Sequence, residues 1–111
     1  EGGFVQGLGW LTCEELYFSQ EGKLLTTGPS TYKLPGSRDI PKIFNVKLLE
    51  NAGNEEKTIF RSKAVGEPPL LLAISHFLAL KEAIKASSDT SNSQLLNSPA
   101  TPTEILRVLR S

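Results

Sequence analysis

The stretch that decides the fold lies at residues 62–86 and reads SKAVGEPPLLLAISHFLALKEAIKA. Two prolines, Pro68 and Pro69, open a run that is apolar nearly all round for its first three helical turns. Proline is tolerated in the first turn of a helix, because the N–H that it lacks would have no partner there. A helix that is apolar on most sides is normally buried. The sequence therefore predicts one long, buried helix over residues 69–86.

Glu67 lies directly before this helix and follows Gly66. Glycine permits backbone geometries that other residues avoid, and a residue before proline is biased towards extended conformations. The Glu67 carboxylate is therefore expected on a stiff backbone, between an incoming strand and a helix. Such a carboxylate can serve as a general base, or it can simply complement the positive end of the helix dipole. The residues alone leave both interpretations open.

The beginning of the chain predicts a second helix, over residues 1–18, because Phe4, Leu8 and Leu11 recur at helical spacing. Glycines are unfavourable in a helix by about 1 kcal/mol each against alanine. We therefore expect the close approach of another backbone or of a bulky cofactor to compensate, although an irregular turn before a short helix also fits the pattern. The glycines concerned are Gly2, Gly3, Gly7 and Gly9.

The middle of the chain predicts short strands at residues 23–27, 43–49 and 58–65, where apolar residues alternate or cluster between turn signals. Near the end, Thr101 can cap a short helix that begins with Pro102, and Glu104 is placed to complete a capping box. The expected fold class is therefore α+β. It comprises a few short strands, an N-terminal helix, a long buried helix and a short C-terminal helix.

The composition excludes several classes of function. Twelve basic and twelve acidic residues cancel, so we expect neither a nucleic acid nor a membrane surface as partner. The longest apolar stretch, at residues 68–80, is too short to span a bilayer. One histidine, His76, and one cysteine, Cys13, cannot form a zinc or haem site of their own. We expect His76 in the core, and Cys13 weakly favours a reducing compartment.

Five motifs together resemble the molybdenum hydroxylases, the family of xanthine dehydrogenases and aldehyde oxidases. Residues 62–69 are similar to the signature around that family's catalytic glutamate, and residues 1–9 resemble its helix beside the pterin. The other three motifs follow in the family's order and spacing: TGPSTYKLP at 27–35, DIP with FNV at 39–46, and SPATP at 98–102. The resemblance covers nearly the whole chain.

The resemblance implies that residues 1–111 are the C-terminal portion of a molybdopterin-binding domain. Glu67 would be the general base of an oxidoreductase that hydroxylates hypoxanthine or xanthine with oxygen from water, with Val65 and Gly66 as possible pocket neighbours. The cofactor would be molybdenum-molybdopterin, while iron–sulfur clusters and FAD would bind outside this chain. Electrons would pass to NAD or dioxygen.

The resemblance also implies that the intact enzyme is a homodimer, cytoplasmic or alternatively peroxisomal, and that this chain packs against the remainder of the enzyme. The absence of methionine and the patterned first residues lead us to expect a segment of something longer, inactive alone. Two alternatives remain open: an aldehyde oxidase of the same family, and a small non-catalytic α+β interaction domain.

Overall fold

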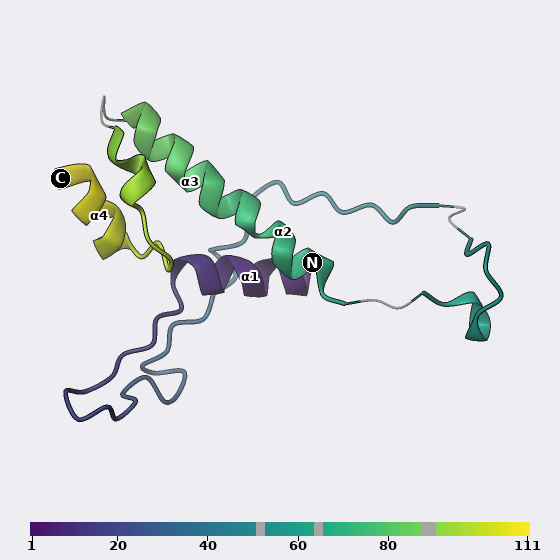
Figure 1. The fold of residues 1–111 in the computed structure, drawn as a ribbon, viewed down its shortest axis with the longest axis horizontal. Coiled ribbons are helices and arrows are strands. Elements are labelled where there is room, and N and C mark those ends of the chain that lie inside the picture. Colours follow the sequence, from purple (N-terminus) through teal and green to yellow (C-terminus); the bar gives the residue numbers. More distant parts are fainter. Residues whose placement is uncertain (51–52, 64–65, 88–90) are drawn as a thin grey trace.

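The computed structural model describes residues 1–50, 53–63, 66–87 and 91–111, and their regular structure is helical (Figure 1). The helices are α1 (Gly2–Thr12), α2 (Pro68–Leu72), α3 (Ile74–Ser87) and α4 (Pro102–Arg110), with short 3-10 helices η1 (Ile59–Arg61) and η2 (Ser91–Leu95). Within these four ranges, β-type pairing is limited to one isolated antiparallel bridge between Phe18 and Leu24. In the same part of the chain, no helix is long and apolar enough to cross a membrane.

The α+β prediction is wrong, because none of the three expected strands forms in the described residues. The segments 23–27 and 43–49 are irregular, and η1 occupies part of 58–65, whose last two residues lie outside the described ranges. Alternating side chains favour a strand only where a neighbouring strand can pair its N–H and C=O groups. Here the second segment lies in the open, with Leu48 89% exposed.

The predicted long helix is present as two helices, α2 and α3, which meet at Ala73. The Ala73 N–H donates to the Leu70 carbonyl at 3.2 Å, and the His76 N–H donates to the Ala73 carbonyl at 3.0 Å. Both bonds span three residues, which tightens the chain at this point.

The expected burial of this helix is also wrong for the chain as it stands. Ala73 is fully buried, but Leu71 and Leu72 are about two-thirds exposed, at 66% and 64%. His76 is only partly buried and lies outside the core cluster. A helix that is apolar on all sides is suited to burial on all sides. In this chain, however, α2 is covered mainly by α1.

The contact between α1 and α2 explains the glycines of α1, which is shorter than predicted and ends at Thr12. A side-chain carbon built at Gly7 would lie 2.5 Å from the Leu70 carbonyl oxygen and 2.7 Å from the Ala73 Cβ. One built at Gly3 would meet the Pro69 Cβ at 3.4 Å. The close approach of another backbone, expected from the sequence, is therefore confirmed at Gly7, whereas Gly3 makes an ordinary contact. The segment is a helix rather than an irregular turn.

A second cluster of buried residues joins the other helices. Its members are Ile84, Leu96, Ala100 and Val108, with Phe77, Leu80 and Ile105 packed against them. These residues come from α3, from the segment around η2 and from α4, which lie together at one end of the molecule (Figure 1). The Ala100 N–H donates to the Leu11 carbonyl at 2.7 Å and so joins this end to α1.

The loop that follows α1 is attached to the end of this helix by a hydrogen bond of Tyr32. The Tyr32 hydroxyl donates to Glu14 Oε2 at 2.5 Å, and Glu14 is buried just beyond the end of α1. A side-chain carbon at Gly9 would collide with Pro35 and with the Glu14 carboxylate, so the bare backbone of α1 makes room for this loop. The hydrogen bond to Glu14 raises the pKa of the Tyr32 phenol above its ordinary value of 10.

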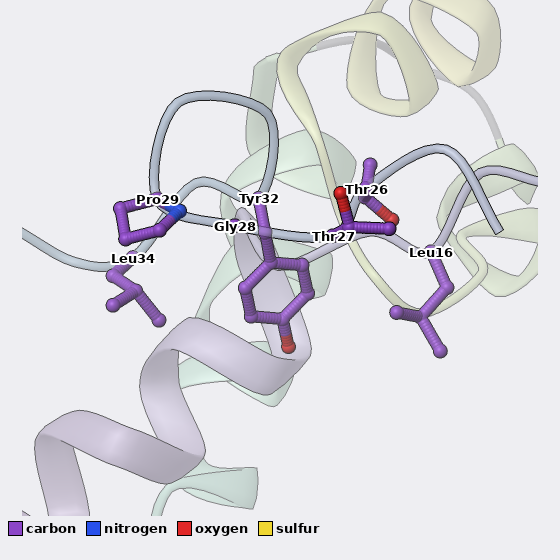
Figure 2. Close-up of a pocket in the computed structure, with 7 residues that line it drawn as sticks. All are labelled: Leu16, Thr26, Thr27, Gly28, Pro29, Tyr32 and Leu34. Atoms are coloured by element: carbon purple, nitrogen blue, oxygen red, sulfur yellow. The ribbon is translucent and has the colours of Figure 1, made fainter.

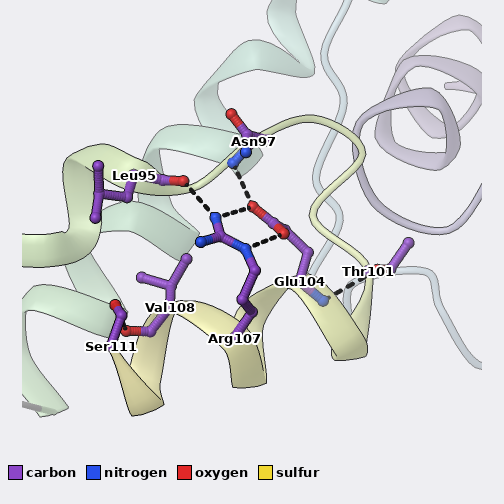
Figure 3. A network of polar contacts seen from close by, with 7 residues as sticks. All are labelled: Leu95, Asn97, Thr101, Glu104, Arg107, Val108 and Ser111. Atoms are coloured by element: carbon purple, nitrogen blue, oxygen red, sulfur yellow. Dashed lines mark hydrogen bonds and ion pairs between the residues drawn. The ribbon is translucent and has the colours of Figure 1, made fainter.

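The start of α4 is capped as predicted, but only in part. The Glu104 N–H donates to Thr101 Oγ1 at 3.2 Å, which confirms the cap. The second half of the capping box is wrong, because the Glu104 carboxylate turns to Arg107 instead. Arg107 grips it with two hydrogen bonds of 2.8 and 2.7 Å and also donates to the Leu95 carbonyl, while the Asn97 N–H donates to Glu104 Oε1 (Figure 3).

The molecule is extended for its length. Its radius of gyration is 18.3 Å and its extents are 55 × 40 × 24 Å, whereas a compact domain of this length would have a radius of roughly 13 Å. Figure 1 shows the cause: the segment between the first helix and α2 swings far from the helices and returns. Such a shape leaves much apolar surface uncovered, as expected of a chain that packs against other parts of a protein.

Glu104 should make the attachment of α4 sensitive to acid. Arg107, followed by the Asn97 amide, lowers the pKa of Glu104 from 4.5 to about 2. Because the folded-state pKa is the lower one, the stabilisation is present above pH 4.5 and is lost as the pH falls through about 2. Hydrogen exchange of the Asn97 amide, corrected for its intrinsic pH dependence, should show this loss. The Glu104→Gln variant should not show it, and an unchanged acid response in that variant would contradict the assignment.

Tyr32 should titrate at a lower pH when its acceptor is neutralised. In Glu14→Gln the hydrogen bond to a carboxylate is lost, so the pKa of the phenol should fall back towards its ordinary value. The phenol carbon shift of isotope-labelled Tyr32, followed by NMR against pH, measures this directly. Glu15→Gln is the matched control, since Glu15 is the neighbouring carboxylate and does not bond Tyr32. Equal titration curves in both variants would rule out the contact.

Candidate catalytic carboxylate and its surroundings

Glu67 lies at the N-cap position of α2, with φ −114° and ψ 54°. This is outside the extended region that the following proline favours. The Glu67 carbonyl accepts the N–H of Leu70 at 3.0 Å, so the backbone of Glu67 belongs to the first turn of α2. The side chain makes no capping hydrogen bond and is exposed. The Glu67 carboxylate is therefore exposed and does not cap the N-terminus of α2.

The interpretation of Glu67 as a helix-end charge gains little from this geometry. A carboxylate that stabilises a helix start normally accepts an N–H of the first turn, and that bond is absent at Glu67. The helix that follows has only five residues, so few peptide dipoles are aligned behind it. The Glu67 side chain thus makes no hydrogen bond to the helix that it precedes.

The two predicted neighbours of Glu67 are found in different circumstances. Gly66 is exposed, and a side-chain carbon built there would meet no atom within 4 Å. The predicted neighbour Val65 lies outside the described residues. The structure thus places Gly66 and Glu67 together at an open corner before α2, and sequence reasoning had identified this pair.

Sequence reasoning did not identify what holds this corner in place. The first turn of α2 lies on α1, where Gly3 faces Pro69 and Gly7 faces Leu70 and Ala73. The signal was available in the sequence, because glycines four residues apart occupy one face of a helix. What the sequence could not show is that the partner of this face is the helix that follows Glu67.

Two hollows lie elsewhere on the molecule. One, of about 250 Å³, is lined by residues of the loop after α1 and is largely apolar: Leu16, Thr26, Thr27, Gly28, Pro29, Tyr32 and Leu34 (Figure 2). The other, of about 300 Å³, lies beside the start of α4: Glu15, Tyr17, Asn97, Ser98, Pro99, Thr101, Thr103, Glu104 and Arg107. Neither is lined by Glu67, so neither is a pocket for chemistry at that carboxylate.

The described residues do not provide a metal ligand set. In the ranges that the structure describes, no three side chains of the types His, Cys, Asp and Glu gather where they could hold an ion. Glu67 is a single carboxylate with open space around the adjoining Gly66. Glu67 is therefore not part of a metal ligand set formed by the described residues.

Comparison with known proteins agrees with the motifs. Residues 1–41 match the family model of the molybdopterin cofactor-binding domain. The xanthine dehydrogenase/oxidase of Felis catus is 55% identical over 111 residues, and that of Mus musculus is 54% identical over 111 residues; each alignment covers 95% of this chain. The xanthine dehydrogenase of Dictyostelium discoideum is 50% identical over 104 residues, or 91% of this chain.

The chain spans about 8% of the length of these relatives. Identity of this degree over 91–95% of the chain is far above what a shared fold alone would require. The resemblance drawn from the five motifs is thereby confirmed, and the chain belongs, as a short segment, to the xanthine dehydrogenase/oxidase family.

Proposed function

We propose that this chain is the C-terminal portion of the molybdopterin-binding domain of a molybdenum-dependent oxidoreductase, and that Glu67 is the enzyme's general base. The enzyme would hydroxylate hypoxanthine or xanthine with oxygen derived from water. The observation that carries the proposal is the exposed Glu67 carboxylate, which makes no hydrogen bond within its helix. The similarity to xanthine dehydrogenases over 95% of the chain supports the reaction class.

Glu67 would remove a proton from the water-derived oxygen that attacks the substrate carbon. A base must lie within hydrogen-bonding reach of the proton that it takes, and its acceptor oxygens must be free to do so. Glu67 is exposed and makes no hydrogen bond within its helix, which supports the second condition. Gly66 leaves the space beside Glu67 open, which would let substrate and cofactor approach the carboxylate, and we assign Val65 to the same pocket by analogy with the family.

Molybdenum-molybdopterin would supply the redox chemistry when it is bound. The residues described here would not ligate the metal, since they form no ligand set. The match of residues 1–41 to a molybdopterin cofactor-binding domain supports a position of the cofactor near α1. Iron–sulfur clusters, FAD and the final acceptor, NAD or dioxygen, would be bound by parts of the enzyme outside this chain.

The exposed apolar residues of α2, Leu71 and Leu72, suit a surface that is covered by another part of a protein, and we propose that the remainder of the enzyme polypeptide covers it. By analogy with the family, we also propose that the intact enzyme is a homodimer that works in the cytoplasm or in peroxisomes. A free-standing interaction domain is disfavoured by the radius of gyration, 18.3 Å. The relatives named above are xanthine dehydrogenases, which favours that activity over an aldehyde oxidase.

Glu67→Gln in the full enzyme should lower the rate of xanthine hydroxylation by about 10²–10⁴-fold, the range that a positioned base contributes. Glutamine keeps the size of the side chain and removes its basicity. Glu67→Asp should also be poor, because it withdraws the carboxylate by one methylene group and a misplacement of ~1 Å can cost ~10²-fold. Steady-state turnover, measured together with molybdenum content and the flavin spectrum, tests the prediction.

Glu82→Gln is the control for this experiment. Glu82 is an exposed carboxylate on α3, so its neutralisation should change the rate little. Near-normal turnover in Glu67→Gln, at full molybdenum loading, would show that the carboxylate is not the base.

The 111-residue chain alone should be inactive. Its helices expose apolar residues that need a partner, and the described residues form no metal ligand set. Incubation of the isolated chain with molybdenum cofactor and xanthine should yield no urate above the level of a blank without protein. Measurable turnover would refute the assignment of the chain as one part of a larger active site.

A further inference from the structure

The position of Glu67 depends on what holds α2. This helix has five residues, and an isolated helix of that length has no stability of its own in water. Leu71 and Leu72 are mostly exposed, whereas Ala73, at the C-cap, is fully buried against α1. Apart from the direct connection to α3 through Ala73, the contact with α1 is therefore the described contact that fixes where the first turn of α2, and with it Glu67, lies.

The separation of the two helices is set at Gly7. A side-chain carbon built there would lie 2.5 Å from the Leu70 carbonyl oxygen, 2.7 Å from the Ala73 Cβ and 3.2 Å from the Leu70 Cδ1. Ordinary contact begins at about 3.4 Å, and the nearest of these atoms belongs to the backbone, which cannot rotate out of the way. Any side chain at Gly7 would therefore push the helices apart by roughly 1 Å.

The other glycines of α1 do not have this role. Gly2 has no atom within 4 Å of its built carbon, and Gly3 meets Pro69 at 3.4 Å, which is an ordinary contact. Gly9 faces the loop around Pro35 and the Glu14 carboxylate instead of α2. Helix α1 thus contains one glycine, Gly7, at which an added methyl group must displace α2. It contains another, Gly2, at which an added methyl group meets no atom of the described residues.

We propose that Gly7 is a positioning residue for Glu67: its missing side chain lets the Leu70 backbone rest on α1 and thereby places the carboxylate at the reacting centre. This inference rests on the proposed role of Glu67 as the base. The Leu70 N–H donates to the Glu67 carbonyl at 3.0 Å, and the Leu70 carbonyl oxygen is the atom nearest to the built carbon at Gly7. One residue therefore joins the contact at α1 to the backbone of Glu67.

The test compares Gly7→Ala with Gly3→Ala in the full molybdenum-loaded enzyme. A displacement of ~1 Å at a catalytic group can cost ~10²-fold in rate, so Gly7→Ala should lower kcat and kcat/KM together by about that factor. Gly3 lies on the same face of α1, but a side-chain carbon there makes only an ordinary contact with Pro69, so Gly3→Ala should have a far smaller effect than Gly7→Ala. Hydrogen exchange of a peptide that contains the Leu70 amide should quicken more in Gly7→Ala than in Gly3→Ala.

A double variant separates positioning from general disruption. If Gly7 acts through Glu67, then Gly7→Ala should cause no further loss in a Glu67→Gln background, because the carboxylate that it misplaces is already gone. A full additional ~10²-fold loss in that background would overturn the inference, and so would normal turnover in Gly7→Ala. Loss of molybdenum from Gly7→Ala would also overturn it, since Gly7 would then maintain the cofactor site as a whole.

The proposed function and this inference fail in different ways. Normal turnover in Glu67→Gln would remove the proposed function, whatever Gly7→Ala does. A poor Glu67→Gln enzyme combined with a normal or fully additive Gly7→Ala enzyme would leave Glu67 as the base and remove only the role of Gly7.

Discussion

The contact between the backbone of α1 at Gly7 and helix α2 is the constraint on which the rest of the structure depends. Gly7 lets the Leu70 carbonyl and Ala73 approach α1 more closely than any side chain would allow. The contact joins the two ends of an irregular excursion that contains most of the first two-thirds of the chain (Figure 1). Without it, little in the described residues would hold the segment before α2 near the first helix, because the other attachments there are single contacts such as Phe4 with Phe44.

The same constraint explains why the molecule is open. Close helix packing through glycine buries backbone and small side chains, such as Ala73, and leaves the large apolar residues of α2 facing outwards. The hydrophobic effect favours covering such residues, and no other element among the described residues covers Leu71 and Leu72. The chain spans about 8% of the length of the relatives that it resembles. Its exposed apolar surface therefore suits a segment that packs against other parts of a larger protein.

Sequence reasoning located the helices because their signals are local. The apolar spacing of Phe4, Leu8 and Leu11, the prolines before α2 and the Thr101 cap each act within one or two turns. The strands failed because pairing is decided by a partner elsewhere, which the segment around Leu48 lacks. The break at Ala73 and the turn of Glu104 towards Arg107 also escaped prediction, since each follows from a neighbour that no local pattern specifies.

The candidate site was also predictable only in part. Glu67 could be singled out from Gly66 and the prolines, and the family resemblance gave it a role, but its support from α1 could not be read from the segment itself. The break at Ala73, which separates α2 from α3, makes the support from α1 important for the position of Glu67. On one side of Ala73, α2 packs against α1, and on the other side α3 contributes Ile84 to the cluster that also contains Val108. The orientation of the carboxylate thus depends on the glycine contact, whereas the second cluster serves mainly to hold the C-terminal helices together.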